Sequence, residues 1–76
     1  MMDYKKYKDI NVMFGIILRR FREGRDMSQS DFAEMCQISR AYYGRIERGE
    51  HSATVEMCGR IAEALGISLA DLFQDL

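Results

Sequence analysis

Hydrophobic residues recur at spacings of three and four along most of the chain, the spacing that places side chains on one side of an α-helix. The first segment with this pattern predicts a helix from Ile10 to Arg22 that ends near Gly24. Its expected buried positions are Ile10, Phe14, Ile17, Leu18 and Phe21. No segment alternates strictly between apolar and polar residues, so the sequence predicts no strands.

Serine marks the start of three further helices, because its hydroxyl oxygen accepts a hydrogen bond from the free N–H groups of a first helical turn. Ser28 begins a predicted helix that reaches about Cys36, and Ser39 begins one from Arg40 to Arg48. Ser68 begins a last short helix, and an acidic residue follows three positions after both Ser28 and Ser68. The second of the predicted helices buries Phe32, Ala33 and Cys36.

Glycine marks two helix ends, since it adopts the left-handed conformation without steric cost. Gly49 closes the third predicted helix, and Gly66 stops a fourth that runs from about Ala53 to Leu65. The apolar positions expected to be buried in the fourth helix are Val55, Cys58, Ile61, Ala62 and Leu65. The fold class is therefore all-α, a compact bundle of five short helices.

Several classes of function lack the residues that they require. The two cysteines lie inside predicted helices, so we expect buried, reduced thiols in a cytoplasmic protein. Cys36, Cys58 and His51 have no metal-ligand spacing, and no acid–base cluster or glycine-rich phosphate loop supports an enzyme. The apolar runs are too short for a membrane span. We expect no enzyme activity, cofactor, metal, membrane or small-molecule ligand.

Charge is distributed unevenly although the net charge is only −1. Residues 1–48 contain ten Lys and Arg against seven Asp and Glu, whereas residues 49–76 contain one Arg against five acids. One half of the molecule can therefore face phosphate while the other half faces away, although mixed solvated faces also produce such a pattern.

The second and third predicted helices, joined by a short turn, satisfy the geometry of a helix-turn-helix, whose second helix enters the DNA major groove. On a helical wheel, Tyr43 and Ile46 point inward with Glu47 beside them. The residues expected on the outward side are Arg40, Ala41, Gly44, Arg45 and Arg48. Two interpretations of Gly44 stay open: it clears space for the groove, or it permits a close helix crossing.

A series of motifs in fixed order resembles the lambda-repressor-like (Cro and Xre type) helix-turn-helix family. These motifs are Phe14-Gly15 to Leu18, Arg22, Met27-Ser28-Gln29, Phe32-Ala33, Ile38-Ser39-Arg40, Ile46-Glu47-Arg48-Gly49, Ile61-Ala62 and Ala64-Leu65-Gly66. The resemblance covers residues 14–73. It implies a sequence-specific regulator of transcription that binds double-stranded DNA as a homodimer on an inverted-repeat operator.

The resemblance also implies roles for individual residues. The expected base contacts are Arg40, Ala41 and Arg45, consistent with arginine's two-pronged pairing to guanine. The expected DNA backbone contacts are Ser28, Gln29, Ser39, Tyr42 and Arg48. His51 in the following loop either contacts DNA or is an inert surface residue. The family pattern pairs Arg22 with Glu47, which we interpret as a structural ion pair.

Two positions depart from the family. Relatives commonly have glycine where this chain has Gln37, so Gln37 adopts a left-handed conformation or the turn differs. Ala53 replaces a common proline at the expected start of the fourth helix, which a helix start tolerates. The segment Arg40 to Glu50 is similar to the controller proteins of restriction-modification systems, compact dimers that regulate their own promoter. Other stand-alone repressors share much of this segment.

The last helix supplies the expected dimer interface. Its apolar residues are Leu69, Leu72, Phe73 and Leu76, part of which must also close the monomer core. Residues 10–76 form the predicted DNA-binding domain, and residues 1–9 continue the first helix, form a basic arm or are disordered. The alternative function is a protein-interaction module, an antitoxin or adaptor that keeps the fold without binding DNA.

Overall fold

A computed structural model describes the backbone of residues 4–76 and the side chains of residues 10–76. Its helices are α1 (Tyr4–Gly24), α2 (Gln29–Met35), α3 (Arg40–Glu47), α4 (Val55–Leu65) and α5 (Leu69–Leu72). The described residues contain no strand, which confirms the predicted all-α bundle of five helices. In the N-terminal extension, α1 begins at Tyr4, and residues 1–3 lie outside the described part of the chain.

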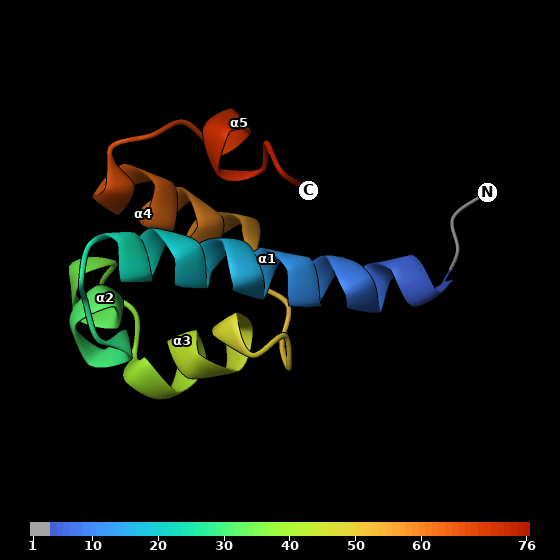
Figure 1. Cartoon of the computed structure of the whole chain (residues 1–76), viewed down its shortest axis with the longest axis horizontal. Coiled ribbons are helices and arrows are strands. Elements are labelled where there is room, and N and C mark those ends of the chain that lie inside the picture. Colours follow the sequence, from blue (N-terminus) through green and yellow to red (C-terminus); the bar gives the residue numbers. More distant parts are fainter. Residues whose placement is uncertain (1–3) are drawn as a thin grey trace.

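The long helix α1 separates the other four helices into two groups. Figure 1 shows α2 and α3 on one side of α1, and α4 and α5 on the other. The N-terminal half of α1 projects beyond the rest of the bundle. This arrangement leaves the outward side of α3 and the surface around α5 on different sides of the molecule.

The predicted serine caps are all present. The Oγ atoms of Ser28, Ser39 and Ser68 accept hydrogen bonds from backbone N–H groups three residues later, at 3.0, 3.1 and 3.0 Å. Ser68 and Asp71 also bond reciprocally, forming a capping box. The predicted starts of α2, α3 and α5 are therefore confirmed. They could be predicted because a side-chain cap acts within one helical turn.

Four residues in the turns have a left-handed backbone, namely Asp26, Gln37, Gly49 and Gly66. Gly49 and Gly66 have φ of 74° and 71°, as predicted for glycines that follow a helix. Gln37 adopts φ 60° despite its side chain, so the turn between α2 and α3 keeps its shape without glycine. Two hydrogen bonds hold Gln37 in place. Its N–H donates to the Glu34 carbonyl, and the Gln37 carbonyl accepts from the Arg60 guanidinium.

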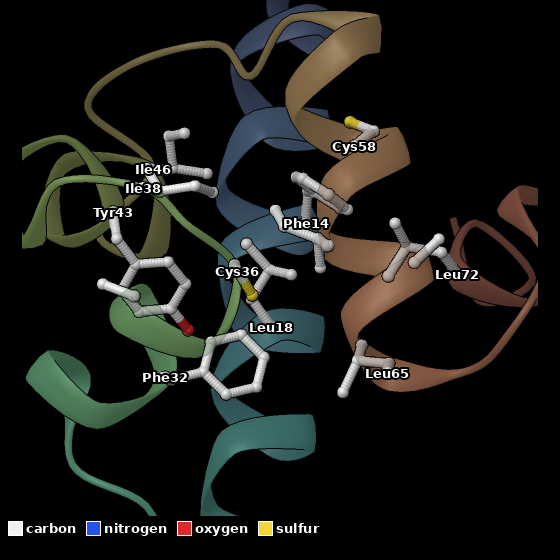
Figure 2. Close-up of a cluster of buried hydrophobic side chains, with 13 residues drawn as sticks. Phe14, Leu18, Phe32, Cys36, Ile38, Tyr43, Ile46, Cys58, Leu65 and Leu72 are labelled. Carbon is white, nitrogen blue, oxygen red and sulfur yellow. The ribbon is translucent and has the colours of Figure 1, made fainter.

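The core draws on all five helices (Figure 2). Its buried hydrophobic members are Phe14, Ile17, Leu18, Phe32, Ala33, Cys36, Ile38, Tyr43, Ile46, Cys58, Ile61, Ala62, Leu65 and Leu72. Cys36 and Cys58 are free, buried thiols, as predicted, and burial raises the pKa of Cys36 to about 11. Among the residues that the structure describes, no helix is long and apolar enough to cross a membrane.

Two predicted core positions and one helix start are wrong. Ile10 is 41% exposed and Val55 is 81% exposed, because both line an open surface groove that no element packs over among the residues that the structure describes. The fourth helix begins at Val55 rather than Ala53. Thr54 is its N-cap, with Oγ1 accepting from the Met57 N–H at 3.1 Å, so Ala53 precedes the helix.

Candidate nucleic-acid interface

Helix α3 has one buried side and one exposed side. Tyr43 and Ile46 are 0% and 1% exposed and pack in the core, while Arg40, Ala41, Arg45 and Arg48 are exposed. The turn at Gln37 places α3 after α2 with its outward side directed away from α1 (Figure 1). The wheel inferred from the sequence therefore matches the exposure of these side chains.

The buried side of α3 approaches α1 closely at Gly15. A Cβ atom at Gly15 would overlap the carbonyl oxygen of Glu47 and lie 2.9 Å from that of Ile46. Gly49 is similarly constrained, because a Cβ there would lie 2.9 Å from a side-chain carbon of Val12. Close backbone contact at these two points fixes α3 against α1.

An ion pair joins the end of α1 to the end of α3. Arg22 donates from Nε and Nη2 to the two oxygens of Glu47 at 2.9 and 2.8 Å, and from Nη1 to the carbonyl of Met27 at 3.0 Å. The Glu47 side chain is 5% exposed. Burial alone raises the pKa of Glu47, but hydrogen bonds from Arg22 and Gln29 more than offset this, and the pKa lies below its usual range. The pair is therefore charged and structural at neutral pH.

The Tyr43 hydroxyl is a buried polar group that the charge of Glu47 reaches, and Figure 2 shows it pointing toward the ring of Phe32. The ring lies 5.2 Å from that of Phe32. The hydroxyl has no hydrogen-bond partner among the described residues. Burial, with the negative charge of Glu47, raises its pKa far above the usual range, so it remains protonated.

Two arginines on the outward side, Arg40 and Arg45, differ from most other arginines of the molecule. Arg19, Arg22, Arg48 and Arg60 form ion pairs with Glu23, Glu47, Glu50 and Glu56, respectively. Arg40 and Arg45 are exposed and form no ion pair or side-chain hydrogen bond with any described residue. Their guanidinium donors are therefore available to a ligand that approaches this side of α3.

Gly44 does not lie open on the outward side as expected. It is buried, and a Cβ atom there would lie 2.9 Å from Nη1 of Arg48 and 3.6 Å from Oε1 of Gln29. The Arg48 guanidinium covers the space that a side chain at Gly44 would occupy. Gly44 therefore makes room for this arginine, and neither interpretation of Gly44 from the sequence included that contact.

The predicted backbone contacts lie around α2 and α3. Ser28 and Ser39 are exposed, and because their oxygens accept the cap bonds, each keeps an O–H to donate. Gln29 is half-buried and donates one N–H to Glu47 at 3.2 Å. Tyr42 lies edge-on to the exposed His51, with ring centroids 5.4 Å apart. Exposed hydrogen-bond donors thus border the arginines.

Two contacts near the C-terminal end of α3 were not predicted from the sequence. Glu50 binds Arg48 through both carboxylate oxygens, at 2.8 and 3.4 Å. Asn11 and Ser52 exchange hydrogen bonds at 3.0 and 3.2 Å, which tie the following loop to α1. The acidic residue two positions after Arg48 was a sequence signal for the first contact. The contact between Asn11 and Ser52 had no such signal, because 41 residues separate them.

The residues expected at a dimer interface do not share one environment. Leu69, Phe73 and Leu76 are 38%, 38% and 44% exposed. Leu72 is 1% exposed and belongs to the monomer core, so it has no free surface for a partner. Phe73 also packs on Phe14, with ring centroids 5.8 Å apart.

Comparison with known proteins gives consistent matches over most of the chain. The helix-turn-helix family model matches residues 18–72. Control protein C.MunI from a Mycoplasma species is 38% identical over 69 residues, which are 90% of this chain and 93% of that protein. Control protein C.BamHI from Bacillus amyloliquefaciens is 34% identical over 65 residues, 84% and 80% of the two chains.

A similar match comes from a solved structure. The restriction-modification controller protein C.AhdI from Aeromonas hydrophila superposes with a TM-score of 0.80 at 30% identity. The superposition covers 87% of this chain and 96% of that one. The similarity therefore includes nearly the whole length of both proteins and not the helix-turn-helix alone.

Proposed function

This chain belongs to the helix-turn-helix family and is a DNA-binding regulator of transcription, and we propose that it reads an inverted-repeat operator as a homodimer. The observation that carries this proposal is the pair of exposed arginines without ion pairs, Arg40 and Arg45, on the outward side of α3. In this family geometry the second helix enters the major groove. Each guanidinium there can donate two parallel hydrogen bonds to O6 and N7 of a guanine.

The neighbouring side chains supply contacts to the DNA backbone. The free O–H groups of Ser28 and Ser39 can donate to phosphate oxygens, and Tyr42 and His51 border the same side of α3. Gln29 uses one amide N–H for Glu47 and keeps the other. Such contacts set the position of the protein on the duplex, while the arginines select the sequence.

The dimer uses the side of the molecule away from α3. A surface groove of about 180 Å³ is lined by residues of α1, of α4 and the loop before it, and of the chain after α5. Its lining includes four exposed or half-exposed apolar side chains, Ile10, Val55, Phe73 and Leu76. Burying these side chains against a second copy removes apolar surface from water, and α3 of each copy remains free to enter DNA.

The roles of the relatives support a proposal about the regulated genes. C.MunI and C.BamHI are control proteins, and C.AhdI is a restriction-modification controller. We extend this role to the present chain, which would regulate its own promoter within a restriction-modification system. Neighbouring endonuclease and methyltransferase genes would support this role.

In-vitro selection from a random duplex library tests the sequence-reading function. The wild-type protein should enrich an inverted repeat, and the Arg40→Ala, Arg45→Ala double variant should not. Arg19→Ala is the control, because Arg19 lies on α1, is exposed and is paired with Glu23. Circular dichroism establishes that each variant is folded.

Two outcomes would contradict the proposal. If the wild-type protein enriches no motif even at low salt, the chain does not read DNA, and the protein-interaction alternative replaces this function. If the double variant enriches the same motif as the wild-type protein, the arginines do not carry the selection.

Sedimentation over a range of concentrations tests the dimer separately. Val55→Glu places a charge in the apolar groove and should shift the protein to a monomer. Ser30→Glu adds the same charge at an exposed position on α2 and should leave the dimer unchanged. A dimer that tolerates Val55→Glu as well as Ser30→Glu would place the interface elsewhere.

A further inference from the structure

Arg48 occupies the centre of the outward side of α3 but is not free. On the helical wheel it lies beside Ala41, with Arg40 and Arg45 towards the two edges. Its Nε donates to Oε2 of Glu50 at 2.8 Å and its Nη2 to Oε1 at 3.4 Å. The side chains are 52% and 56% exposed, so the ion pair is part of the surface that would face DNA.

The backbone at the end of α3 positions both members of the pair. Gly44, one turn before Arg48, leaves room for Nη1 of the guanidinium. Gly49 has φ 74° and turns the chain back, so the Glu50 N–H donates to the carbonyl of Arg45 at 2.9 Å. Glu50 is therefore held near the last turn of α3, within reach of Arg48.

The pairing determines which donors of Arg48 are left. Glu50 occupies Nε–H and one N–H of Nη2, an edge of the guanidinium that a phosphate could also bind through two oxygens. The outer edge, with one N–H each on Nη1 and Nη2, donates no hydrogen bond to Glu50. That edge has two parallel donors, which match the O6 and N7 acceptors of guanine.

Charge acts in the same direction. The hydrogen bond from Arg48 lowers the pKa of Glu50, so the carboxylate is charged at neutral pH. An arginine that is already paired with Glu50 gains little from a phosphate contact. Either the ion pair must break, or the negative Glu50 carboxylate must lie close to the negative DNA backbone. Binding to DNA of arbitrary sequence depends mostly on contacts between positive side chains and phosphates. Neutralising Arg48 therefore weakens this non-specific binding more than it weakens binding to a specific sequence.

We propose that Glu50 is a specificity-determining residue that acts through Arg48. By holding Arg48, it suppresses binding to arbitrary DNA while leaving one edge of the guanidinium for a guanine. This inference rests on the DNA-binding function proposed above, and it adds Glu50 to that function as a positioning residue.

Affinities of four variants for two duplexes test the inference. The first duplex is the sequence most enriched by the wild-type protein, and the second is a scrambled sequence of the same length and composition. The variants are Glu50→Gln, Arg48→Ala, the double variant and Glu56→Gln. Glu56→Gln is the matched control, since Glu56 forms an exposed ion pair with Arg60 on α4.

Glu50→Gln should bind the scrambled duplex severalfold more tightly than the wild-type protein. A freed Arg48 adds about one phosphate contact, so the salt slope on that duplex should steepen by about one. Affinity for the enriched duplex should change less, so that the ratio of the two affinities falls. In the Arg48→Ala background, Glu50→Gln should not raise affinity for the scrambled duplex, and Glu56→Gln should leave the ratio at its wild-type value.

Each other outcome overturns the inference. An equal rise on both duplexes would make Glu50 a general repellent of DNA. The same rise without Arg48 would mean that Glu50 does not act through it, and no change would assign Glu50 no role in selection. Should the wild-type protein itself not distinguish the two duplexes, the proposed function fails together with the inference; should it distinguish them and Glu50→Gln keep the ratio, only the inference fails.

Discussion

The two sides of α3 meet different environments along the same eight residues. On the inner side, Tyr43 and Ile46 are buried and Glu47 is paired with Arg22. On the outer side, Arg40 and Arg45 contact no other described side chain through an ion pair or hydrogen bond. The charged group on the inner side is paired within the chain. On the outer side, by contrast, Arg40 and Arg45 have donors without acceptors among the described residues.

The contrast indicates where stability and binding can be changed separately. Substitutions on the inner side remove packing or leave a buried charge, so they unfold the domain and thereby abolish binding. Exposed substitutions on the outer side usually change stability by no more than about 0.5 kcal/mol, so their effects should appear in binding alone. Five predictions test this separation.

The largest effect is expected from Arg22→Ala. Removing one partner of a buried ion pair typically costs about 3–5 kcal/mol, and the Glu47 carboxylate would remain almost fully buried. Urea unfolding should show a loss of this size, with DNA binding reduced only in proportion to the unfolded fraction. The exposed ion pair between Arg19 and Glu23 offers a control, since Arg19→Ala should reduce the free energy of unfolding far less. A stable Arg22→Ala variant would remove the structural role from this pair.

Acid should weaken the same contact. The pKa of folded Glu47 is below its usual range, so its contribution to stability is present above the pKa of an unfolded glutamate, about 4.3. That contribution is lost as the pH falls through the lower pKa of the folded state. Thermal unfolding between pH 7 and pH 3 should therefore show a steeper loss for the wild-type protein than for Glu47→Gln. Parallel profiles would contradict the assignment.

Gly15→Ala should be the next most destabilising change. The added Cβ overlaps the Glu47 carbonyl, and backbone atoms cannot rotate away as a side chain can. Overpacking typically costs about 1–3 kcal/mol, so the midpoint of urea unfolding should decrease. Gly24→Ala, also on α1, meets no atom within 4 Å and is the control. Equal stability of the two variants would mean that α1 and α3 are less closely packed than described.

Arg45→Ala should affect binding without affecting folding. Losing a bidentate contact removes about 1–3 kcal/mol of discrimination against the wrong base. Stability should stay within about 0.5 kcal/mol of the wild-type protein because the side chain is exposed. Competition between the enriched and scrambled duplexes measures the first quantity, and thermal unfolding measures the second. A large loss of stability would place Arg45 in the fold and not in the interface.

Gly44→Ala should have the smallest effect on the free protein, with the opposite sign to Gly15→Ala. Alanine favours a helix interior over glycine by about 1 kcal/mol, and the only close neighbour is the flexible end of Arg48. The variant should unfold at the same temperature as the wild-type protein or slightly above it. A clear decrease would indicate that Arg48 is held too firmly to move.

Much of the helix-turn-helix could be predicted because its signals are local. Ser39 caps α3 and Gly49 ends it through hydrogen bonds and backbone angles within a few residues of each position. Helical periodicity then separates the buried Tyr43 from the exposed Arg45 without knowledge of any other helix. The candidate base contacts could therefore be named from the sequence.

The positions that were misjudged depend on what lies opposite them. Val55 and Ile10 match the helical periodicity of a core residue, yet no described part of the chain covers them. Leu72 is the residue of the expected interface that closes the monomer core, and the apolar pattern alone did not distinguish it from Leu69. A repeat of three and four residues identifies one side of a helix but not where along that side a neighbour begins or ends.

The sequence by itself determined the number and type of the helices, most of their ends and the residues on the outer side of α3, because caps, glycine turns and periodicity act over short distances. Only the tertiary structure decided that Arg48 covers Gly44 and pairs with Glu50, that Gly15 meets Glu47, and which apolar residues stay exposed. These contacts depend on side-chain paths and on helices brought together from distant parts of the chain, which no local pattern specifies.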